Sequence, residues 1–150
     1  MNSLIQRVRR RALSEYNSRV HGSSVPFVHV RPDEITEESW VDAPIHPPDI
    51  LEGSPRAAIF TCATSDDGGT TVGLWRCTAG RFKWTFQCDE VVRILEGEVR
   101  VIVDGQEHHL EKDSLAFFGV GTVSEWWVPN FVQKEFFHRH PSPVLGRVLG

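Results

Sequence analysis

The sequence of 150 residues has little of what marks secreted, membrane-bound or zinc-stabilised proteins. It holds only three cysteines, Cys62, Cys77 and Cys88, and their spacing suits free thiols in a reducing compartment better than a disulfide scaffold. No CxxC or HxxxH spacing occurs, so the usual zinc signatures are absent. No apolar run reaches the length of a membrane span, and no apolar signal-peptide core follows Met1. We therefore expect a cytoplasmic protein that does not enter membranes.

The sequence also lacks a large excess of charge of one sign. The formal net charge of −4 gives phosphates no overall attraction, which argues against a general nucleic-acid binder. The apolar and charged fractions are ordinary, and no repeat or low-complexity tract is visible. A chain of this length is expected to form one domain with a sizeable hydrophobic core.

The N-terminal third differs from the rest, and we expect residues 1–56 to form a mostly irregular arm in front of a domain at 57–150. Residues 1–20 hold five arginines against one acid, which fits a solvated basic helix or tail. A contact with an acidic partner or an organellar presequence is the alternative for this segment. Residues 25–31 are predicted to form an edge strand. Residues 43–55 contain four prolines and are predicted to form a loop that packs along a surface or reaches a neighbouring subunit.

From residue 57 onward, short strands follow one another at steady intervals. Gly97 breaks two β-branched runs, and Asp104-Gly105 is a strong signal for a two-residue hairpin. Phe82, Trp84 and Phe86 alternate with polar residues, which places the three rings on one face. The expected strands are 58–62, 71–77, 81–86, 91–95, 99–103, 106–110, 115–118, 123–128 and 133–137. A turn is expected at Ala79-Gly80, between the second strand and the third. Many short strands at this spacing indicate an all-β sandwich or barrel.

Several of these segments carry a likeness to a known family. They are residues 73–86, Asp89-Glu90, Ile94-Leu95-Glu96-Gly97, residues 112–121, Trp126, Val128 and Val132-Gln133-Lys134. Together they resemble the cupin superfamily, and within it the small cupins grouped with the (S)-ureidoglycine aminohydrolase cupin domain. Six residues separate Glu90 from Gly97, as in the first cupin motif. The resemblance covers about residues 57–138 and implies a jelly-roll β-barrel.

The same resemblance shows which metal ligands are missing. Metal-binding cupins carry two histidines four and six positions before the glutamate, and these positions are Phe86 and Trp84 here. The third histidine falls near Ser124, so only Glu90 remains of the four ligands. An aromatic ring offers no lone pair to zinc, manganese or iron. The resemblance therefore implies a cupin without its usual metal site, and we expect no cofactor.

The former ligand positions also predict the character of the barrel interior. They place Trp84 and Phe86 inside it, and Trp75 and Trp126 are expected to extend this aromatic lining. Among apolar walls, desolvation is expected to raise the pKa of Glu90 and make this residue a catalytic acid or base. In the alternative, the rings plug the barrel and a lysine or arginine holds Glu90.

Candidate substrate-binding residues surround this predicted catalytic glutamate. They are Trp75, Trp84, Phe86, Arg93, Ser124, Trp126 and Lys134, with Arg93 standing where the related group has tyrosine. Lys134 either pairs with Glu90, binds an acidic substrate group or lies in solvent.

Two further motifs carry possible chemistry. His138 and His140 form an H-x-H that either lies at the surface or binds a metal at the barrel mouth if a carboxylate approaches. Cys88 has no histidine at a readable spacing, which gives a nucleophilic cysteine little support.

These features favour an enzyme that works without metal and uses Glu90 on a small nitrogen-containing or carboxylated metabolite. One alternative is a module that binds a small ligand without turnover. The other is a structural, dimerising cupin whose residues 25–55 wrap a partner subunit. Exposed sheet edges in cupin-like sandwiches commonly pair across a two-fold axis, so we expect a homodimer.

Overall fold

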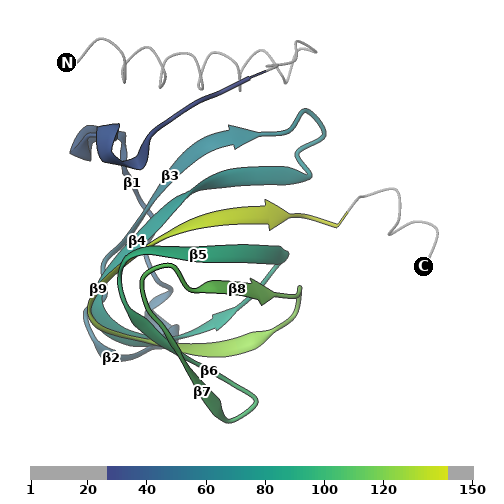
Figure 1. Cartoon of the computed structure of the whole chain (residues 1–150). Coiled ribbons are helices and arrows are strands. Elements are labelled where there is room, and N and C mark those ends of the chain that lie inside the picture. Colours follow the sequence, from purple (N-terminus) through teal and green to yellow (C-terminus); the bar gives the residue numbers. More distant parts are fainter. Residues whose placement is uncertain (1–26, 142–150) are drawn as a thin grey trace.

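The structure is a computed structural model that describes residues 27–141, and these residues form a strongly curved antiparallel sheet preceded by an arm (Figure 1). The arm holds three short 3₁₀ helices, η1 (Pro32–Glu34), η2 (Glu37–Ser39) and η3 (Pro47–Asp49). The strands are β1 (Val41–Asp42), β2 (Ile50–Gly53), β3 (Ala57–Thr64), β4 (Thr70–Thr85), β5 (Asp89–Gly97), β6 (Val99–Val103), β7 (Gln106–Leu110), β8 (Leu115–Phe118) and β9 (Val123–Arg139). The predicted all-β architecture is confirmed.

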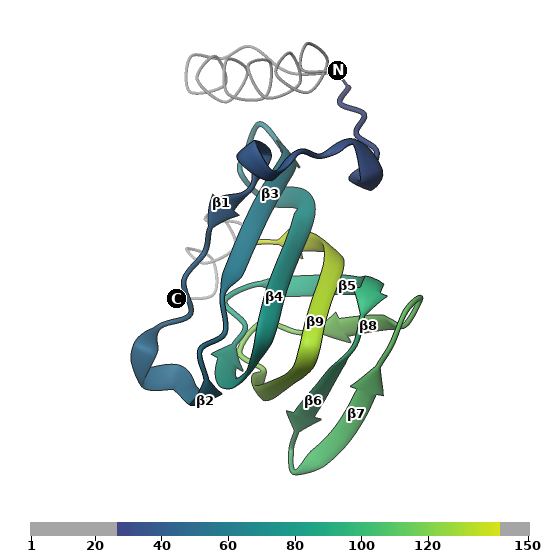
Figure 2. The same cartoon turned by 90° about the vertical axis from the view of Figure 1, so that its left-hand side faces the viewer.

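Two long strands organise the sheet. β4 and β9 pair along almost their whole length, from Thr70 opposite Arg139 to Thr85 opposite Val123. The main strand order is β1-β3-β4-β9-β5-β8, while β2 pairs with β4, and β6 pairs with β7 and β9. Figure 2 shows β3, β4 and β9 side by side, with the β6–β7 hairpin projecting at one end. β9 pairs with β5 over residues 132–139 and with β6 over residues 125–127. This one strand therefore joins both parts of the sheet, which curves around one core.

In two places the sequence predicted two short strands where the structure has one long strand. The predicted strands 71–77 and 81–86 both correspond to parts of β4, and 123–128 and 133–137 both correspond to parts of β9. The expected turn at Ala79-Gly80 is wrong, because β4 continues through it with a register shift between Thr78 and Gly80. A β-carbon on Gly80 would lie 2.6 Å from the Pro55 ring, so glycine permits a close approach here and not a turn. Opposite this shift, Pro129 lies within β9 between the paired residues Val128 and Phe131 and has no partner residue on β4.

The arm takes part in the sheet more than its prolines suggested. The predicted strand at 25–31 is wrong for its described part, because residues 27–31 have no regular structure and β1 occupies the edge of β3. Within the predicted loop 43–55, β2 pairs with β4. The predicted basic helix or tail at 1–20 lies outside the described residues. Within residues 27–141, no helix is long and apolar enough to cross a membrane.

Both predicted glycine turns are confirmed. Gly97 has φ +71°, and a β-carbon there would lie 1.9 Å from the carbonyl oxygen of Phe131. Asp104 and Gly105 have φ values of 50° and 75°, as a two-residue hairpin between β6 and β7 requires. Gly97 bends the chain between β5 and β6, which both pair antiparallel with β9, whereas Asp104-Gly105 reverses the chain between β6 and β7.

The core lies inside the curved sheet and is rich in rings. Its largest fully buried side chains are Trp126, Phe82 and Phe86. The rings of Phe86 and Phe118 stack with centroids 4.3 Å apart, and Trp75 meets Trp126 edge to face at 5.9 Å. Full burial of one large apolar side chain contributes about 1.5–3 kcal/mol, so this cluster is a major stabilising element.

Candidate functional site

A cavity of about 220 Å³ opens on the inner face of the sheet, where the arm meets it. It is lined by Ala43, Pro44, Ile59, Trp75, Phe82, Trp84, Glu90, Trp126, Lys134, Phe136 and His138. Ala43 and Pro44 come from the arm, which therefore forms one wall. The remaining lining residues project from β3, β4, β5 and β9, so the cavity depends on the register of four strands.

Strand pairing explains why the charged groups meet at one place. Glu90 on β5 lies directly opposite His138 on β9, and Trp75 on β4 lies opposite Lys134 on β9. Lys134, Phe136 and His138 alternate along β9, so their side chains share the inner face. The cavity is therefore apolar except at this one group of ionisable residues.

Glu90 is buried between two donors. Lys134 Nζ donates to Oε2 of Glu90 at 2.6 Å, and His138 Nε2 hydrogen-bonds to Oε1. Burial alone would raise the pKa of Glu90, but the charge of Lys134 and the hydrogen bonds from His138 and Lys134 outweigh it and hold the pKa below its usual value. The expected rise of this pKa is therefore wrong, and Glu90 is a carboxylate at neutral pH.

Lys134 is held on its other sides by rings. Its Nζ lies 4.9 Å from the centroid of Trp75 and 4.8 Å from that of Trp126. Such contacts stabilise a desolvated ammonium group through the negative face of the indole. The structure thus shows the pairing of Lys134 with Glu90, one of the three alternatives that the sequence left open. We call Glu90, Lys134 and His138 the polar trio.

The former metal-ligand positions have separate roles. Trp84 lies at the cavity rim and is 38% exposed. Phe86 is buried against Phe118 and fills the interior below the cavity without lining it. Ser124 Oγ accepts a hydrogen bond from Trp126 Nε1 and donates one to the carbonyl of Trp84, so Ser124 positions the lining without belonging to it.

These residues do not fit the metal that cupins usually hold at this place. Trp84 and Phe86 have no ligand atom to offer, and the hydroxyl of Ser124 is engaged by its two partners. Both oxygens of Glu90 already face cationic or N–H donors. Glu90, the one residue of the usual ligand set that remains, is engaged in a buried ion pair with Lys134.

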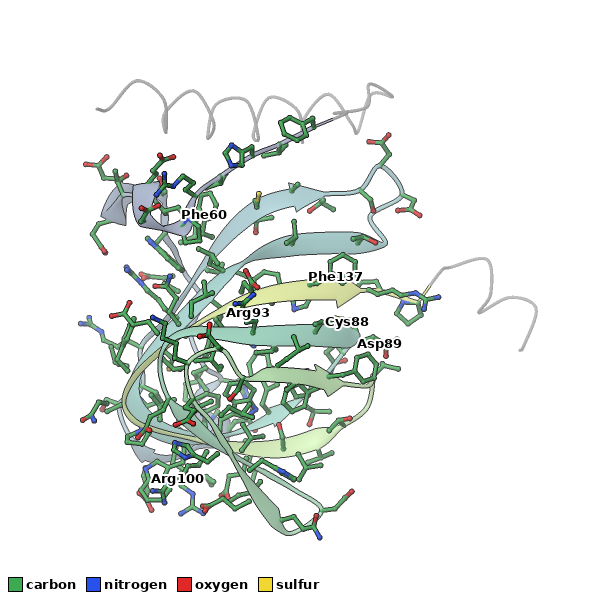
Figure 3. The ribbon with its side chains drawn as sticks, viewed as in Figure 1. Phe60, Cys88, Asp89, Arg93, Arg100 and Phe137 are labelled. Carbon is green, nitrogen blue, oxygen red and sulfur yellow. The ribbon has the colours of Figure 1, made fainter. Side chains whose placement is uncertain are left out.

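Arg93 is not brought to the cavity. It lies on β5 (Figure 3), and its guanidinium hydrogen-bonds with Asp113 at 3.3 Å on the outer face. Because strand residues alternate between faces, a position three residues from Glu90 must face the opposite side. The alternation of strand residues would have predicted from the sequence that Arg93 faces away from Glu90. The prediction that Arg93 binds the substrate is therefore wrong.

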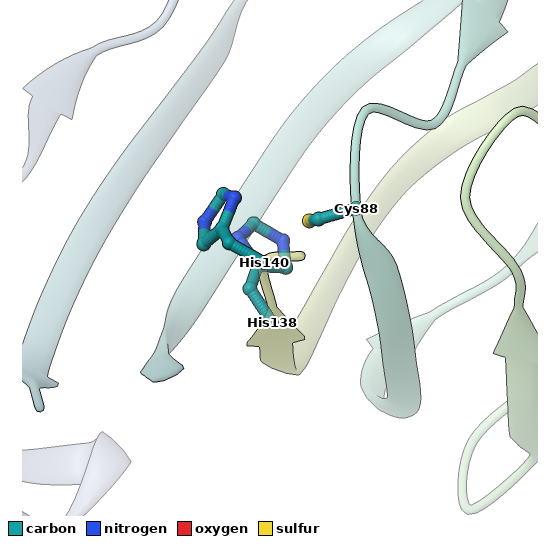
Figure 4. Close-up of side chains that lie close together, drawn as sticks. All are labelled: Cys88, His138 and His140. Carbon is teal, nitrogen blue, oxygen red and sulfur yellow. The ribbon is translucent and has the colours of Figure 1, made fainter. Parts of the chain in front are cut away.

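A second group of candidate ligands lies next to the polar trio. One ligand atom each from Cys88, His138 and His140 lies within 4.8 Å of the others (Figure 4). Cys88 is buried and His140 is exposed. The sequence showed the H-x-H and the cysteine separately, but strand pairing across 48 residues, as between Glu90 and His138, cannot be read from local spacing. The thiol, and not the expected carboxylate, completes this group.

Comparisons with known proteins support the fold. Residues 64–136 match the family model of the EutQ-like cupin domain. A cupin superfamily protein from Desulfitobacterium hafniense has a similar structure, with a TM-score of 0.50 at 14% identity over 61% of this chain and 82% of that one. The chain has a cupin fold. The predicted likeness to this superfamily is confirmed, whereas the closer likeness to the ureidoglycine aminohydrolase group stays a prediction.

Two other solved structures show the same cupin fold. A putative ethanolamine utilization protein Q from Salmonella typhimurium LT2 has a TM-score of 0.57 at 19% identity, over 81% of this chain and 99% of that one. A protein of unknown function from Pseudomonas syringae pv. tomato has a TM-score of 0.62 at 16% identity, over 66% of this chain and 43% of that one. No curated protein matches this chain significantly in sequence.

Proposed function

We propose that this cupin binds a small, flat, neutral metabolite with an amide- or urea-like group in the aromatic cavity. The observation that carries the proposal is the polar trio, with Glu90 and Lys134 buried, at one place in an otherwise apolar cavity. The ligand's polar group must meet the trio, because the other lining side chains are aliphatic or aromatic.

The charge balance of the trio argues for a neutral partner. Lys134 and the ionised Glu90 cancel, so a ligand anion approaches a carboxylate and a ligand cation approaches an ammonium. An amide or urea offers N–H donors to Glu90 and a carbonyl acceptor to Lys134. The faces of Trp75, Trp84 and Trp126 favour a flat group beside it.

Matched probes test this preference. Benzamide, benzoate and benzylamine have nearly the same shape but are neutral, anionic and cationic. We expect benzamide to raise the melting temperature of the protein most, because a ligand that binds only the folded form stabilises it. A larger shift with benzoate or benzylamine, or no shift with any probe, would contradict the proposal.

Charge-changing variants sharpen the test. Glu90→Gln leaves the trio with a net positive charge, and the preference should move to benzoate. Lys134→Gln leaves a net negative charge, and the preference should move to benzylamine. Trp84→Ala should weaken binding of every probe, whereas Arg93→Ala on the outer face should change none. Circular dichroism of each variant checks that it is folded.

Turnover adds one requirement to binding. A glutamate with a lowered pKa is ionised at neutral pH, so Glu90 suits the role of base better than that of acid. His138 then holds one oxygen of this base in place. If the cupin is an enzyme, Glu90→Gln should abolish turnover of an amide-like substrate while the protein still folds. Retained turnover would assign the site to binding alone.

A second candidate role, self-association, is favoured by the outer face of the sheet. Val72, Phe137, Val91 and Phe117 lie opposite one another on β4, β9, β5 and β8, and all four are exposed (Figure 3 labels Phe137). We call this line the outer apolar row. Monomeric proteins rarely leave such a contiguous apolar surface uncovered.

We propose that a second copy of this chain covers the outer apolar row. Pairs of opposite charge flank it on both sides, Glu135 opposite Arg93 and Arg139 opposite Asp89. A balanced surface of this kind is complementary to itself when rotated by a two-fold axis.

Light scattering after size-exclusion chromatography tests this self-association. We expect a dimer that Phe117→Glu converts to a monomer. Val123→Glu is the control, because Val123 is 64% exposed against 66% for Phe117 but lies at the far end of β9. A monomeric parent protein, or equal effects of the two variants, would refute this role.

A further inference from the structure

Cys88, Glu90, His138 and His140 form a two-by-two arrangement on the inner face, where the start of β5 meets the end of β9. Glu90 lies opposite His138, and Asp89 lies opposite Arg139. Continuing this antiparallel register by one residue places Cys88 opposite His140. Residues two apart in a strand share a face, so a C-x-E segment meets an H-x-H segment.

We propose that Cys88, His138 and His140 form a binding site for a borderline-soft divalent cation, with Zn²⁺ as the natural occupant. Two imidazoles and a thiolate are ligands that Zn²⁺ prefers, and three protein ligands leave a fourth position for water or another molecule. The site is distinct from the usual metal position of the fold, where Trp84 and Phe86 stand.

The hydrogen bond between His138 and Glu90 supports this assignment. His138 meets Glu90 through Nε2, which leaves Nδ1 as the nitrogen for another partner. Metal-bound histidines commonly donate their second ring N–H to a carboxylate, which orients the ring and increases its basicity. Glu90 supplies that carboxylate and is itself held by Lys134.

The spacing of the ligand atoms requires only a small closure. They lie within 4.8 Å of one another, whereas tetrahedral ligands about 2.0–2.3 Å from Zn²⁺ lie roughly 3.5 Å apart. His140 is exposed, and its ring is free to turn by rotamer changes that cost little at a surface.

Metal titration of the full, untagged chain tests the site directly and needs no knowledge of the small-molecule ligand. After chelator treatment, we expect one equivalent of Zn²⁺ to bind by calorimetry. Co²⁺ should produce the thiolate-to-metal absorption band and the intense visible bands of a tetrahedral site. Failure to bind one equivalent of Zn²⁺, or a Co²⁺ spectrum without the thiolate band, would refute the proposal.

Variants identify the ligands. Removing an outer partner of a metal ligand costs roughly 10- to 100-fold in affinity, so His140→Ala, which removes a ligand itself, should cost about 100-fold or more. Cys88→Ser should abolish the thiolate band of the Co²⁺ form. His108→Ala is the control, because His108 is also exposed but lies on β7, outside the group. Equal Zn²⁺ affinity of His140→Ala and His108→Ala would overturn the proposal even if both variants fold.

Discussion

The ammonium nitrogen of Lys134 lies 2.6 Å from a carboxylate oxygen of Glu90, and the two side chains are only 7% and 6% exposed. Such a pair is costly to bury and costly to break. The pair is the charged part of an otherwise apolar cavity, so it decides both the chemistry of the cavity and part of the stability of the barrel.

Breaking this pair from one side should destabilise the fold. Lys134→Met leaves Glu90 buried beside His138 alone, and we expect a loss of about 3–5 kcal/mol in the free energy of unfolding. Urea denaturation measures this loss, and Lys83→Met, at an exposed position on β4, is the control. The double variant Glu90→Gln/Lys134→Met should lose less than the sum of the single losses, because neither charge is then left alone. Additive losses would show that the two groups are not coupled.

The lowered pKa of Glu90 predicts a pH dependence of stability. A group whose pKa is depressed by folding stabilises the native state above its unfolded pKa of about 4.3, and this stabilisation is lost as the pH falls through the folded value. The stability difference between the parent protein and Glu90→Gln should therefore be largest near neutral pH and shrink in acid. Melting temperatures of both proteins from neutral to strongly acidic pH measure it. Parallel curves would contradict the lowered pKa.

Gly97 at the β5–β6 bend and Gly105 in the β6–β7 hairpin should differ sharply in their tolerance of alanine. Gly97 and Gly105 have φ values of 71° and 75°, but only at Gly97 would the added β-carbon meet a backbone oxygen, that of Phe131. Gly105→Ala should cost about 1–2 kcal/mol from its backbone conformation alone. Gly97→Ala should cost clearly more, because the strand has to move as well. Thermal unfolding measures both, and equal costs would contradict the close packing at Gly97.

The thiols should differ in reactivity. Burial raises the pKa of Cys77 to about 12, so almost no thiolate is present at pH 8. Cys62 is only partly buried. We expect iodoacetamide to label Cys62 well before Cys77 in the native protein, with equal labelling after denaturation. Peptide mapping by mass spectrometry distinguishes them, and early labelling of Cys77 would show that the core opens there.

Local signals in the sequence were enough for most of the architecture. Alternation of apolar and polar residues predicted the strands, and Gly97 and Asp104-Gly105 predicted two turns, because both signals depend on residues close in the chain. The errors arose where a local signal had a distant cause. Gly80 looked like a turn residue, but the contact that requires glycine there comes from Pro55 in the arm.

The candidate site, too, was predicted from the sequence only in part. Glu90, the tryptophans of the cavity and the loss of the usual metal ligands followed from the sequence and its cupin motif. The state of Glu90 did not, because its pKa depends on Lys134 and His138, which β9 brings back to β5. The same is true of Cys88 and its two histidines.

By itself, then, the sequence determined that this chain folds as a β-barrel of the cupin kind with aromatic rings where metal ligands are usual. Only the tertiary structure decided that Glu90 is an ionised partner of Lys134, that Arg93 faces outward and that Cys88 meets His138 and His140. The physical reason is how far apart in the chain the interacting residues lie. Turn geometry and strand alternation act between neighbours, whereas burial, ion pairing and ligand grouping depend on the register of strands far apart in the chain.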